Sequence, residues 1–217
     1  MPIARVHSSF LFASWASCLV AATASAQEAP APPAGAPAAE PAAAAAGARV
    51  HDGFYLRLGA GYGPLNTKET VDGSSGELKL KGSGMAYDLT IGGTPFRGVV
   101  IGGSLFTHAV KPTIEAGGTS IEAQKTIFLM SLGPQVDAYL DPKSGFHFGG
   151  GVGWGTLNAV NYTSTGTALH LLAGYDFWIG DNWSAGPMLR LTSSKTSKAP
   201  VNDATTSIAI LFTVLDH

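Results

Sequence analysis

The sequence predicts an all-β fold, a closed barrel of eight antiparallel strands in up-and-down order. Three observations support this prediction. From Gly53 onward, apolar residues alternate with small or polar residues at a period of two, which is typical of β-strands. Eight stretches show this alternation. The connections between them are long and short in strict turn, as expected for an antiparallel meander whose two ends face different surroundings.

The eight predicted strands follow one another without an intervening amphipathic helix. Each is near or above the roughly 9–11 residues that a tilted strand needs to cross a membrane. Every one of them is therefore a candidate membrane-spanning strand. Their predicted bounds are about 53–63, 84–93, 98–108, 126–140, 145–156, 167–179, 182–193 and 204–215.

The first 26 residues are predicted to be a secretory signal peptide. A short basic start precedes an apolar run from Phe10 to Ala22, and small residues then form a cleavage site between Ala26 and Gln27. The one cysteine of the chain, Cys18, lies in this segment, so we expect no disulfide and no cysteine-ligated metal in the mature protein. A lipoprotein signal that uses Cys18 is the less favoured alternative, because the residues before it form a poor lipobox.

Residues 27–49 are rich in proline and alanine and show no apolar periodicity. We interpret them as a disordered periplasmic tether and assign residues 50–217 to one barrel domain. Charged residues make up only 13% of the chain, about half of the roughly 25% that is usual in globular proteins. Because the sequence also has no basic stripe, we expect no binding of nucleic acid.

The two faces of the predicted strands differ in composition, and this difference assigns one face to lipid. In the stretch 146–155, Phe146, Phe148, Val152 and Trp154 alternate with a histidine and glycines. If the apolar residues pointed inward, they would overfill an eight-stranded barrel and leave a nearly uncharged surface in water. If they point to lipid, the glycine-rich face lines a narrow interior. The sequence therefore predicts a transmembrane barrel, closed so that no strand edge is unpaired in hydrocarbon.

Aromatic residues gather near both ends of the predicted strands, as in the interfacial girdles of membrane barrels. One set lies next to the short turns or the N-terminal entry, and the other lies next to the long loops. The predicted girdle residues are Phe54, Phe96, Tyr139, Phe146, Phe177 and Trp183 in the first set and Tyr62, Tyr87, Phe128 and Trp154 in the second.

Together these features resemble the small eight-stranded outer-membrane barrels of the outer membrane protein A, X and W type. The resemblance covers residues 50–217 and rests on the architecture and on phrases such as GFYLRLGAGYG and TALHLLAGYDFWIGDNWSAGPMLRL. It implies a location in the outer membrane of a Gram-negative-type bacterium, contact with outer-membrane lipid and lipopolysaccharide, and folding by the barrel assembly machinery. The ending departs from the family pattern, because five residues follow Phe212 where an aromatic residue usually closes the last strand.

Alternation places a set of polar side chains inside the predicted barrel. Because buried charges must be paired, we interpret them as a salt-bridge network that fills the interior. A proton relay, a selectivity lining or a catalytic cluster is the alternative. Asp176 and Arg190 lie on adjacent predicted strands, as do Arg57 and Asp88. The set comprises Arg57, Asp88, Ser104, His108, Gln135, Asp137, His147, His170, Asp176 and Arg190.

The run FHFGGGVGWGTLN at residues 146–158 has glycines at the spacing of a phosphate-binding loop. Thr156 stands where the lysine of such a loop belongs and no helix is predicted to follow, so we interpret the run as barrel wall. Its inward glycines would leave space for Arg57 or Arg190 to cross the barrel. Prolines within strands mark bulges or edges, so we expect bulges at Pro134 and Pro187.

The leading functional hypothesis is a sealed or nearly sealed outer-membrane barrel with a structural or surface-interaction role. The alternative is a porin-like narrow channel for small or hydrophobic molecules. A lipid A-modifying enzyme is less favoured, because Ser104 and His108 lie about 13 Å apart along one strand face. We therefore expect no catalytic residue, and the scattered histidines indicate no metal site or cofactor. Residues 64–83 and 109–125 are the candidate loops for an extracellular ligand.

Overall fold

The computed structural model describes residues 50–51, 53–73, 76–159 and 162–217. The predicted signal peptide, its cleavage residues Ala26 and Gln27, and the predicted tether lie outside these described residues. Among the described residues, no helix is long and apolar enough to cross a membrane.

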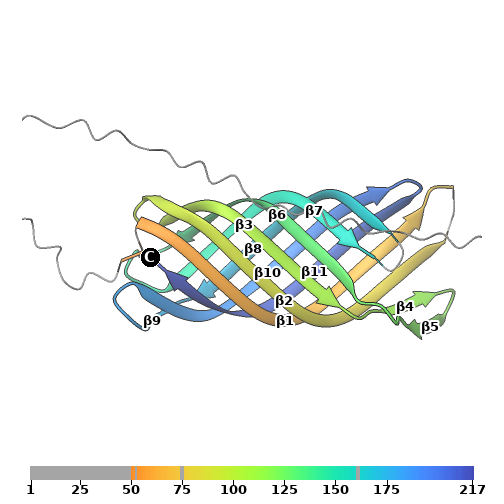
Figure 1. The fold of residues 1–217 in the computed structure, drawn as a ribbon, viewed down its shortest axis with the longest axis horizontal. Coiled ribbons are helices and arrows are strands. Elements are labelled where there is room, and N and C mark those ends of the chain that lie inside the picture. Colours follow the sequence, from red (N-terminus) through yellow and green to blue (C-terminus); the bar gives the residue numbers. More distant parts are fainter. Residues whose placement is uncertain (1–49, 52, 74–75, 160–161) are drawn as a thin grey trace, which may run out of the picture. The chain divides into compact units, whose positions relative to one another are not determined.

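Eight strands form a closed antiparallel barrel (Figure 1). β1 pairs with both β2 and β11, and this double pairing closes the sheet. The structure confirms the predicted all-β, eight-stranded, up-and-down fold. The strands of the barrel are β1 (Gly53–Val71), β2 (Glu77–Phe96), β3 (Val99–Val110), β6 (Ile127–Tyr139), β7 (Phe146–Asn158), β8 (Thr163–Tyr175), β10 (Trp183–Lys198) and β11 (Val201–Asp216).

Three shorter strands are attached to the barrel. β4 (Thr113–Ala116) and β5 (Thr119–Glu122) form a hairpin whose first strand pairs with β2. β9 (Phe177–Trp178) continues the line of β8 beyond Asp176 and pairs with β10. We call the end of the barrel that carries the β4–β5 hairpin the loop end. The opposite end, where β1 starts and β11 finishes, is the terminal end.

The predicted loop at residues 64–83 is wrong for most of its length, because β1 continues to Val71 and β2 begins at Glu77. Alternation continues in this hairpin, since Leu65, Thr67 and Leu80 point inward and are buried. The outward residues of this hairpin are polar. The apolar residues of the outer face therefore end before the strands do. The predicted loop at residues 109–125 likewise contains the β4–β5 hairpin.

The expected bulges at Pro134 and Pro187 are also wrong. The register of β6 against β7 is the same on both sides of Pro134, from Leu132 opposite Trp154 to Gln135 opposite Gly151. A proline lacks the N–H that strand pairing needs, so the hydrogen-bond ladder is interrupted at Pro134. The register of the two strands does not change across this interruption. Around Pro187 the pairing of β10 with β8 and β9 keeps one register in the same way.

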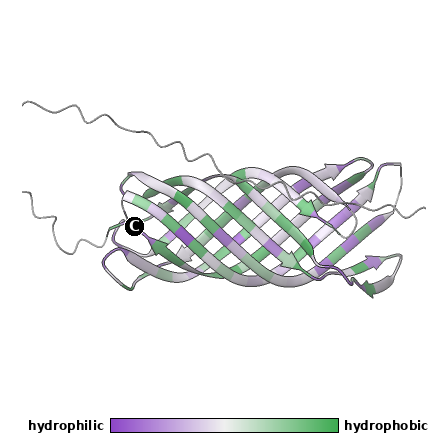
Figure 2. Cartoon of the chain, viewed as in Figure 1, coloured by the Kyte–Doolittle hydropathy of each residue, from purple (hydrophilic) through white to green (hydrophobic). Residues whose placement is uncertain are grey.

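Large apolar side chains are exposed on the outer face and form an apolar band around the barrel. In Figure 2 these residues are the green segments that alternate with white and purple along the strands. On β7 the band runs from Phe146 to Trp154, with Phe148 and Val152 exposed between them. At the usual rise and tilt of barrel strands this span is about 20 Å tall, close to the roughly 25 Å band of membrane barrels. On β1, β2, β10 and β11 the outward residues beyond the band are polar or small. These strands therefore extend past the band toward the loop end.

Candidate functional site

The polar interior of the barrel is the candidate site. The structure places every one of the predicted interior residues on the inner face, and none of these side chains is more than 3% exposed. They come from seven of the eight barrel strands and from the short link between β8 and β9. The residues are Arg57, Asp88, Ser104, His108, Gln135, Asp137, His147, His170, Asp176 and Arg190.

Arg57 is the centre of the network. Its Nη1 donates to Asp137 Oδ2 at 2.7 Å and its Nε lies 3.4 Å from Asp88 Oδ1. Its remaining donors reach Tyr55 Oη at 3.1 Å and Thr90 Oγ1 at 3.3 Å. Charge-assisted hydrogen bonds of this kind are the strong ones in proteins, and they offset the cost of burying the guanidinium.

Arg190 extends the network toward the loop end. Its Nη1 donates to Asp88 Oδ2 and to Ser104 Oγ, the latter at 3.2 Å. The guanidinium also lies over the ring of Phe106, 4.4 Å from the ring centroid. Asp88 is thus shared between Arg57 and Arg190, so that each oxygen of its carboxylate faces one arginine.

The expected pairing of Asp176 with Arg190 is wrong. Arg190 lies opposite Leu172 in the β8–β10 register, four residues or about 13 Å of strand away from Asp176. Asp176 instead accepts a hydrogen bond from Tyr139 Oη at 2.8 Å and lies 3.6 Å from His147 Nε2. The other ring nitrogen of His147 lies 3.0 Å from Asp137. His147 thus links the Arg57 group to Asp176.

Two further polar pairs lie nearer the loop end. His170 Nε2 lies 3.0 Å from Gln135 Oε1. His108 Nδ1 lies 2.6 Å from Ser207 Oγ, while its Nε2 faces the carbonyl oxygens of Gly63 and Gly84 at 3.1 and 3.3 Å. Because a carbonyl only accepts, Nε2 carries the proton and Ser207 donates to Nδ1. Sequence reasoning missed Ser207 although it lies on an inward position, since nothing in the sequence places it beside His108.

The inward glycines of β7 make room for Asp137 and His170, and not for the two arginines as expected. A Cβ on Gly149 would lie 3.0 Å from Asp137 Oδ1, and one on Gly151 would lie 2.8 Å from His170 Cε1 and 2.3 Å from a backbone oxygen. Real Cβ atoms essentially never come closer than 3.0 Å to another atom, and 3.0 Å is tighter than nearly all of their contacts. The glycine run is therefore part of the barrel wall. Its inward positions have no side chain where polar side chains of the neighbouring strands enter the interior.

Tyr139 is not a girdle residue, contrary to the prediction. It is 5% exposed and stacks inside the terminal end on the ring of His51, with 3.7 Å between ring centroids. Its inward position follows from parity, because it shares a strand face with Gln135 and Asp137. The other nine predicted girdle side chains are between 42% and 69% exposed on the outer face. They are Phe54, Tyr62, Tyr87, Phe96, Phe128, Phe146, Trp154, Phe177 and Trp183.

Aromatic rings cover the polar interior at the terminal end, and apolar side chains cover it toward the loop end. At the terminal end, His51 packs against Tyr139, Trp178 and His217, and its Nδ1 lies 3.1 Å from His217 Nε2. Burial and the neighbouring His217 lower the pKa of His51 to about 3. Toward the loop end, six apolar side chains form one buried cluster. They are Leu65, Leu80, Val110, Ile127, Leu129 and Leu157.

Comparisons with known proteins find similarity in structure. No protein-family model and no curated protein sequence matches the chain. The outer membrane protein OprG from Pseudomonas aeruginosa is 13% identical with a TM-score of 0.49, and the comparison covers 78% of this chain and 99% of OprG. Neisserial surface protein A is 15% identical with a TM-score of 0.48, and the comparison covers 75% of this chain and 96% of that protein. Ail, the attachment invasion locus protein of Yersinia pestis, is 12% identical with a TM-score of 0.38, and the comparison covers 75% of this chain and 99% of Ail.

The observed strand order and closure agree with the resemblance that the sequence shows. Each barrel strand pairs with the strand before it and the strand after it, β1 closes on β11, and the large apolar side chains are exposed on the outside. The chain has the fold of the small eight-stranded outer-membrane β-barrels.

Proposed function

We propose that the protein is an outer-membrane barrel with a sealed interior and a structural or surface-interaction role. The observation that carries this proposal is the filled cross-section of the barrel. Arg57 and Arg190 cross the middle and are 0% exposed, and apolar or aromatic layers cover them toward either end. An ion that entered would have to lose its hydration beside uncharged side chains.

The outer face supports a position in the membrane. Its apolar band is long enough for the hydrocarbon core, and the exposed Phe54, Phe96, Tyr62 and Trp154 lie near its borders. Each of the eight barrel strands pairs with a neighbour on both sides, as a bilayer requires. A water-soluble barrel with this surface would expose an apolar area far larger than soluble monomers tolerate.

The β4–β5 hairpin supports a role in surface interaction. It stands on the loop end, beside β2, and exposes Ile121 to 64%. Lys111 and Glu122 form an ion pair of 2.8 Å at the base of the hairpin, which lowers the pKa of Glu122. An exposed apolar side chain on a braced hairpin is a suitable contact for another molecule.

Conductance tests the sealed interior. We expect purified, refolded protein in a planar bilayer to show no steady conductance. Replacement of Leu129 and Leu157 by alanine removes part of the apolar layer and should produce small unitary steps, whereas the outward Leu132→Ala should not. Reproducible unitary steps from the unaltered protein would refute the proposal.

A narrow channel is the second candidate, and one observation favours it. Several buried polar atoms have no hydrogen-bond partner within the described part of the chain, among them Gln135 Nε2, His170 Nδ1, Thr192 Oγ1 and Ser194 Oγ. Buried polar atoms without protein partners are commonly satisfied by water. A file of water along them would form a conduit. The same bilayer recording, together with swelling of protein-loaded liposomes in small sugars, decides between the two candidates.

We further propose that the protein is not an enzyme. The His108–Ser207 contact has the distance of a base and a nucleophile, but neither side chain is more than 1% exposed. A lipid substrate in the membrane would meet the outer wall and not this pair. Incubation with lipopolysaccharide and mass analysis of lipid A tests this, and any mass change absent from a Ser207→Ala variant would contradict it.

A further inference from the structure

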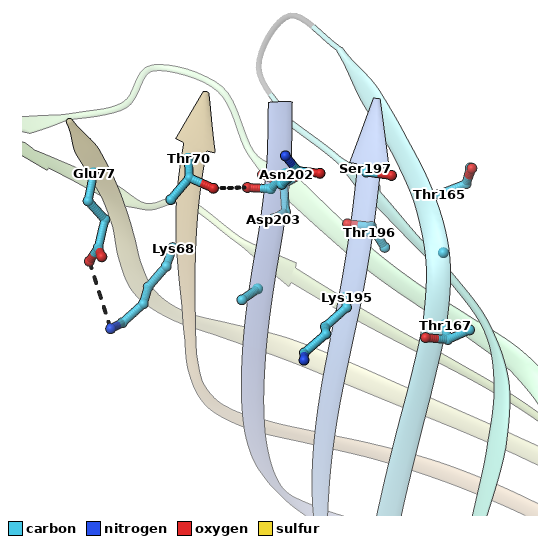
Figure 3. A pocket seen from close by; sticks show the side chains of 12 residues that line it. Lys68, Thr70, Glu77, Thr165, Thr167, Lys195, Thr196, Ser197, Asn202 and Asp203 are labelled. Atoms are coloured by element: carbon cyan, nitrogen blue, oxygen red, sulfur yellow. Dashed lines mark hydrogen bonds and ion pairs between the residues drawn. The ribbon is translucent and has the colours of Figure 1, made fainter. Parts of the chain in front are cut away.

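A groove lies on the outer face of the barrel, just beyond the apolar band toward the loop end. It has a volume of about 470 Å³ and crosses the outward residues of β1, β11, β10 and β8 (Figure 3). Carbon atoms form most of its surface, and its lining residues carry hydroxyl, amide, ammonium and carboxylate groups. The lining residues include Lys68, Glu77, Thr165, Thr167, Lys195 and Ser197.

Two lysines line this groove from strands on either side of β11. Lys68 and Lys195 are both in register with Ala204, which lies between them on β11. The two backbones are therefore about 10 Å apart, and the small alanine leaves the space between the lysines open. Figure 3 shows the Lys68 side chain reaching toward Glu77 on β2 and the Lys195 side chain bending toward β11, both away from the strand ends. Long lysine stems with their charges at the border of an apolar surface are the expected snorkelling arrangement.

The groove has a surplus of positive charge. Glu77 lies 3.8 Å from Lys68 and 3.5 Å from Lys79, so one carboxylate serves two ammonium groups. Lys195 forms no ion pair with any residue that the structure describes. Asp203 points away, into the barrel, where it accepts a hydrogen bond from Ser164 Oγ at 2.5 Å. An anion in the groove would therefore meet two lysines and little opposing charge.

A second groove joins the first from the side of the apolar band. It has a volume of about 570 Å³ and shares Thr167 and Lys195 with the first. Its other lining residues include Pro134, Val152 and Leu169, and the last two are more than half exposed. A cationic, hydroxyl-lined groove thus opens directly into an apolar one on the same outer face.

We propose that the two grooves together bind one phosphate-bearing lipid of the surrounding leaflet, an inference that rests on the proposed membrane position. Its phosphate lies between Lys68 and Lys195, where Thr165, Thr167 and Ser197 supply hydroxyl donors. One acyl chain follows Val152 and Leu169 into the band. Lysine is a compact charge that suits phosphate, and membrane anions attract such residues near the bilayer surface. The lipid matches both grooves because it joins the two chemistries in one molecule.

Native mass spectrometry of the protein in neutral detergent tests this. The probe is bisphosphorylated lipid A, compared with the same glycolipid after removal of its phosphates and with inorganic phosphate alone. The site variant is Lys68→Ala with Lys195→Ala, and the matched control is Lys143→Ala, an exposed lysine in a turn at the terminal end. In the second groove Leu169→Ala is compared with Leu171→Ala, an outward leucine of the same strand that does not line the groove.

We expect the double lysine variant to bind bisphosphorylated lipid A roughly thirtyfold more weakly, equivalent to about 2 kcal/mol at 1.4 kcal/mol per tenfold. Leu169→Ala should weaken binding severalfold, while Lys143→Ala and Leu171→Ala leave it unchanged. Equal binding of the dephosphorylated glycolipid, unchanged binding by the double variant, or equally tight binding of inorganic phosphate alone would overturn the proposal.

The proposed membrane position is checked separately in each sample. A closed, inserted barrel migrates differently on a denaturing gel before and after boiling. If all variants keep this shift in phosphatidylcholine vesicles but the lysines make no difference to lipid binding, only the lipid site fails. If the unaltered protein shows no shift and does not insert, the proposed function itself fails.

Discussion

Replacing Arg57 by methionine is the sharpest test of the interior network. Methionine keeps the length of the side chain but removes the charge that faces Asp137 at 2.7 Å and Asp88 at 3.4 Å. Asp88 keeps Arg190, and Asp137 keeps only the imidazole of His147. Removing one partner of a buried ion pair costs about 3–5 kcal/mol, because the remaining charge stays buried without compensation.

Arg190→Met is the matched comparison. Arg190 has one carboxylate partner, and that carboxylate retains Arg57. Two of its nitrogens, Nε and Nη2, have no partner within the described residues. We therefore expect its loss to lower the free energy of unfolding by about 1–3 kcal/mol, less than the loss of Arg57.

Urea unfolding in phospholipid vesicles, followed by tryptophan fluorescence and by gel migration, measures both variants. Two more variants, Asp137→Asn alone and Asp137→Asn together with Arg57→Met, complete a double-mutant cycle. If the two charges compensate each other, the double variant loses less stability than the two single variants added together. A loss below about 1 kcal/mol for Arg57→Met, or a larger loss for Arg190→Met, would refute the assignment of Arg57 as the centre of the network.

Three further predictions concern stability. Tyr139→Phe removes the hydrogen bond to Asp176 but keeps the ring, so the urea midpoint should fall by the equivalent of about 1.5–3 kcal/mol; an unchanged midpoint would contradict the bond. Gly151→Ala places a Cβ 2.3 Å from a backbone oxygen and should cost about 2 kcal/mol or more, whereas Gly103→Ala meets no atom within 4 Å and should be nearly neutral. His51 has its pKa at about 3 when folded and near 6.5 when unfolded, so the unfolded chain binds the extra proton between these values. Stability contributed by neutral His51 is therefore complete above pH 6.5 and falls by up to about 1.4 kcal/mol per pH unit below it, and His51→Phe should flatten this part of the pH profile of unfolding.

The strands and their faces could be predicted because both are local properties of the chain. In β7, Phe146, Phe148, Val152 and Trp154 alternate with residues too small or too polar for lipid, and the structure exposes all four. The same parity indicates that Tyr139 points inward with Gln135 and Asp137. The girdle prediction for Tyr139 failed because it used nearness to a turn and ignored parity. In the outer half of the β1–β2 hairpin the outward residues are polar, while Leu65 and Leu80 point inward. The apolar outward face that marks the membrane-spanning segments is missing there, so sequence patterning predicts a loop where the strands continue.

The sequence by itself determined the number of strands, their antiparallel order and the division of residues between lipid face and interior, because a period of two is written in neighbouring residues. Only the tertiary structure decided the partners inside. The strand register places Arg190 opposite Leu172, so that Asp176 contacts Tyr139 instead. The closed sheet, in which β1 pairs with β11, also brings Ser207 next to His108. Lys68 and Lys195, which are 195 − 68 = 127 positions apart in sequence, lie on either side of β11 for the same reason. A slip of two residues in any ladder would keep every face and change every partner, so faces are encoded locally and partners are set by the closed sheet.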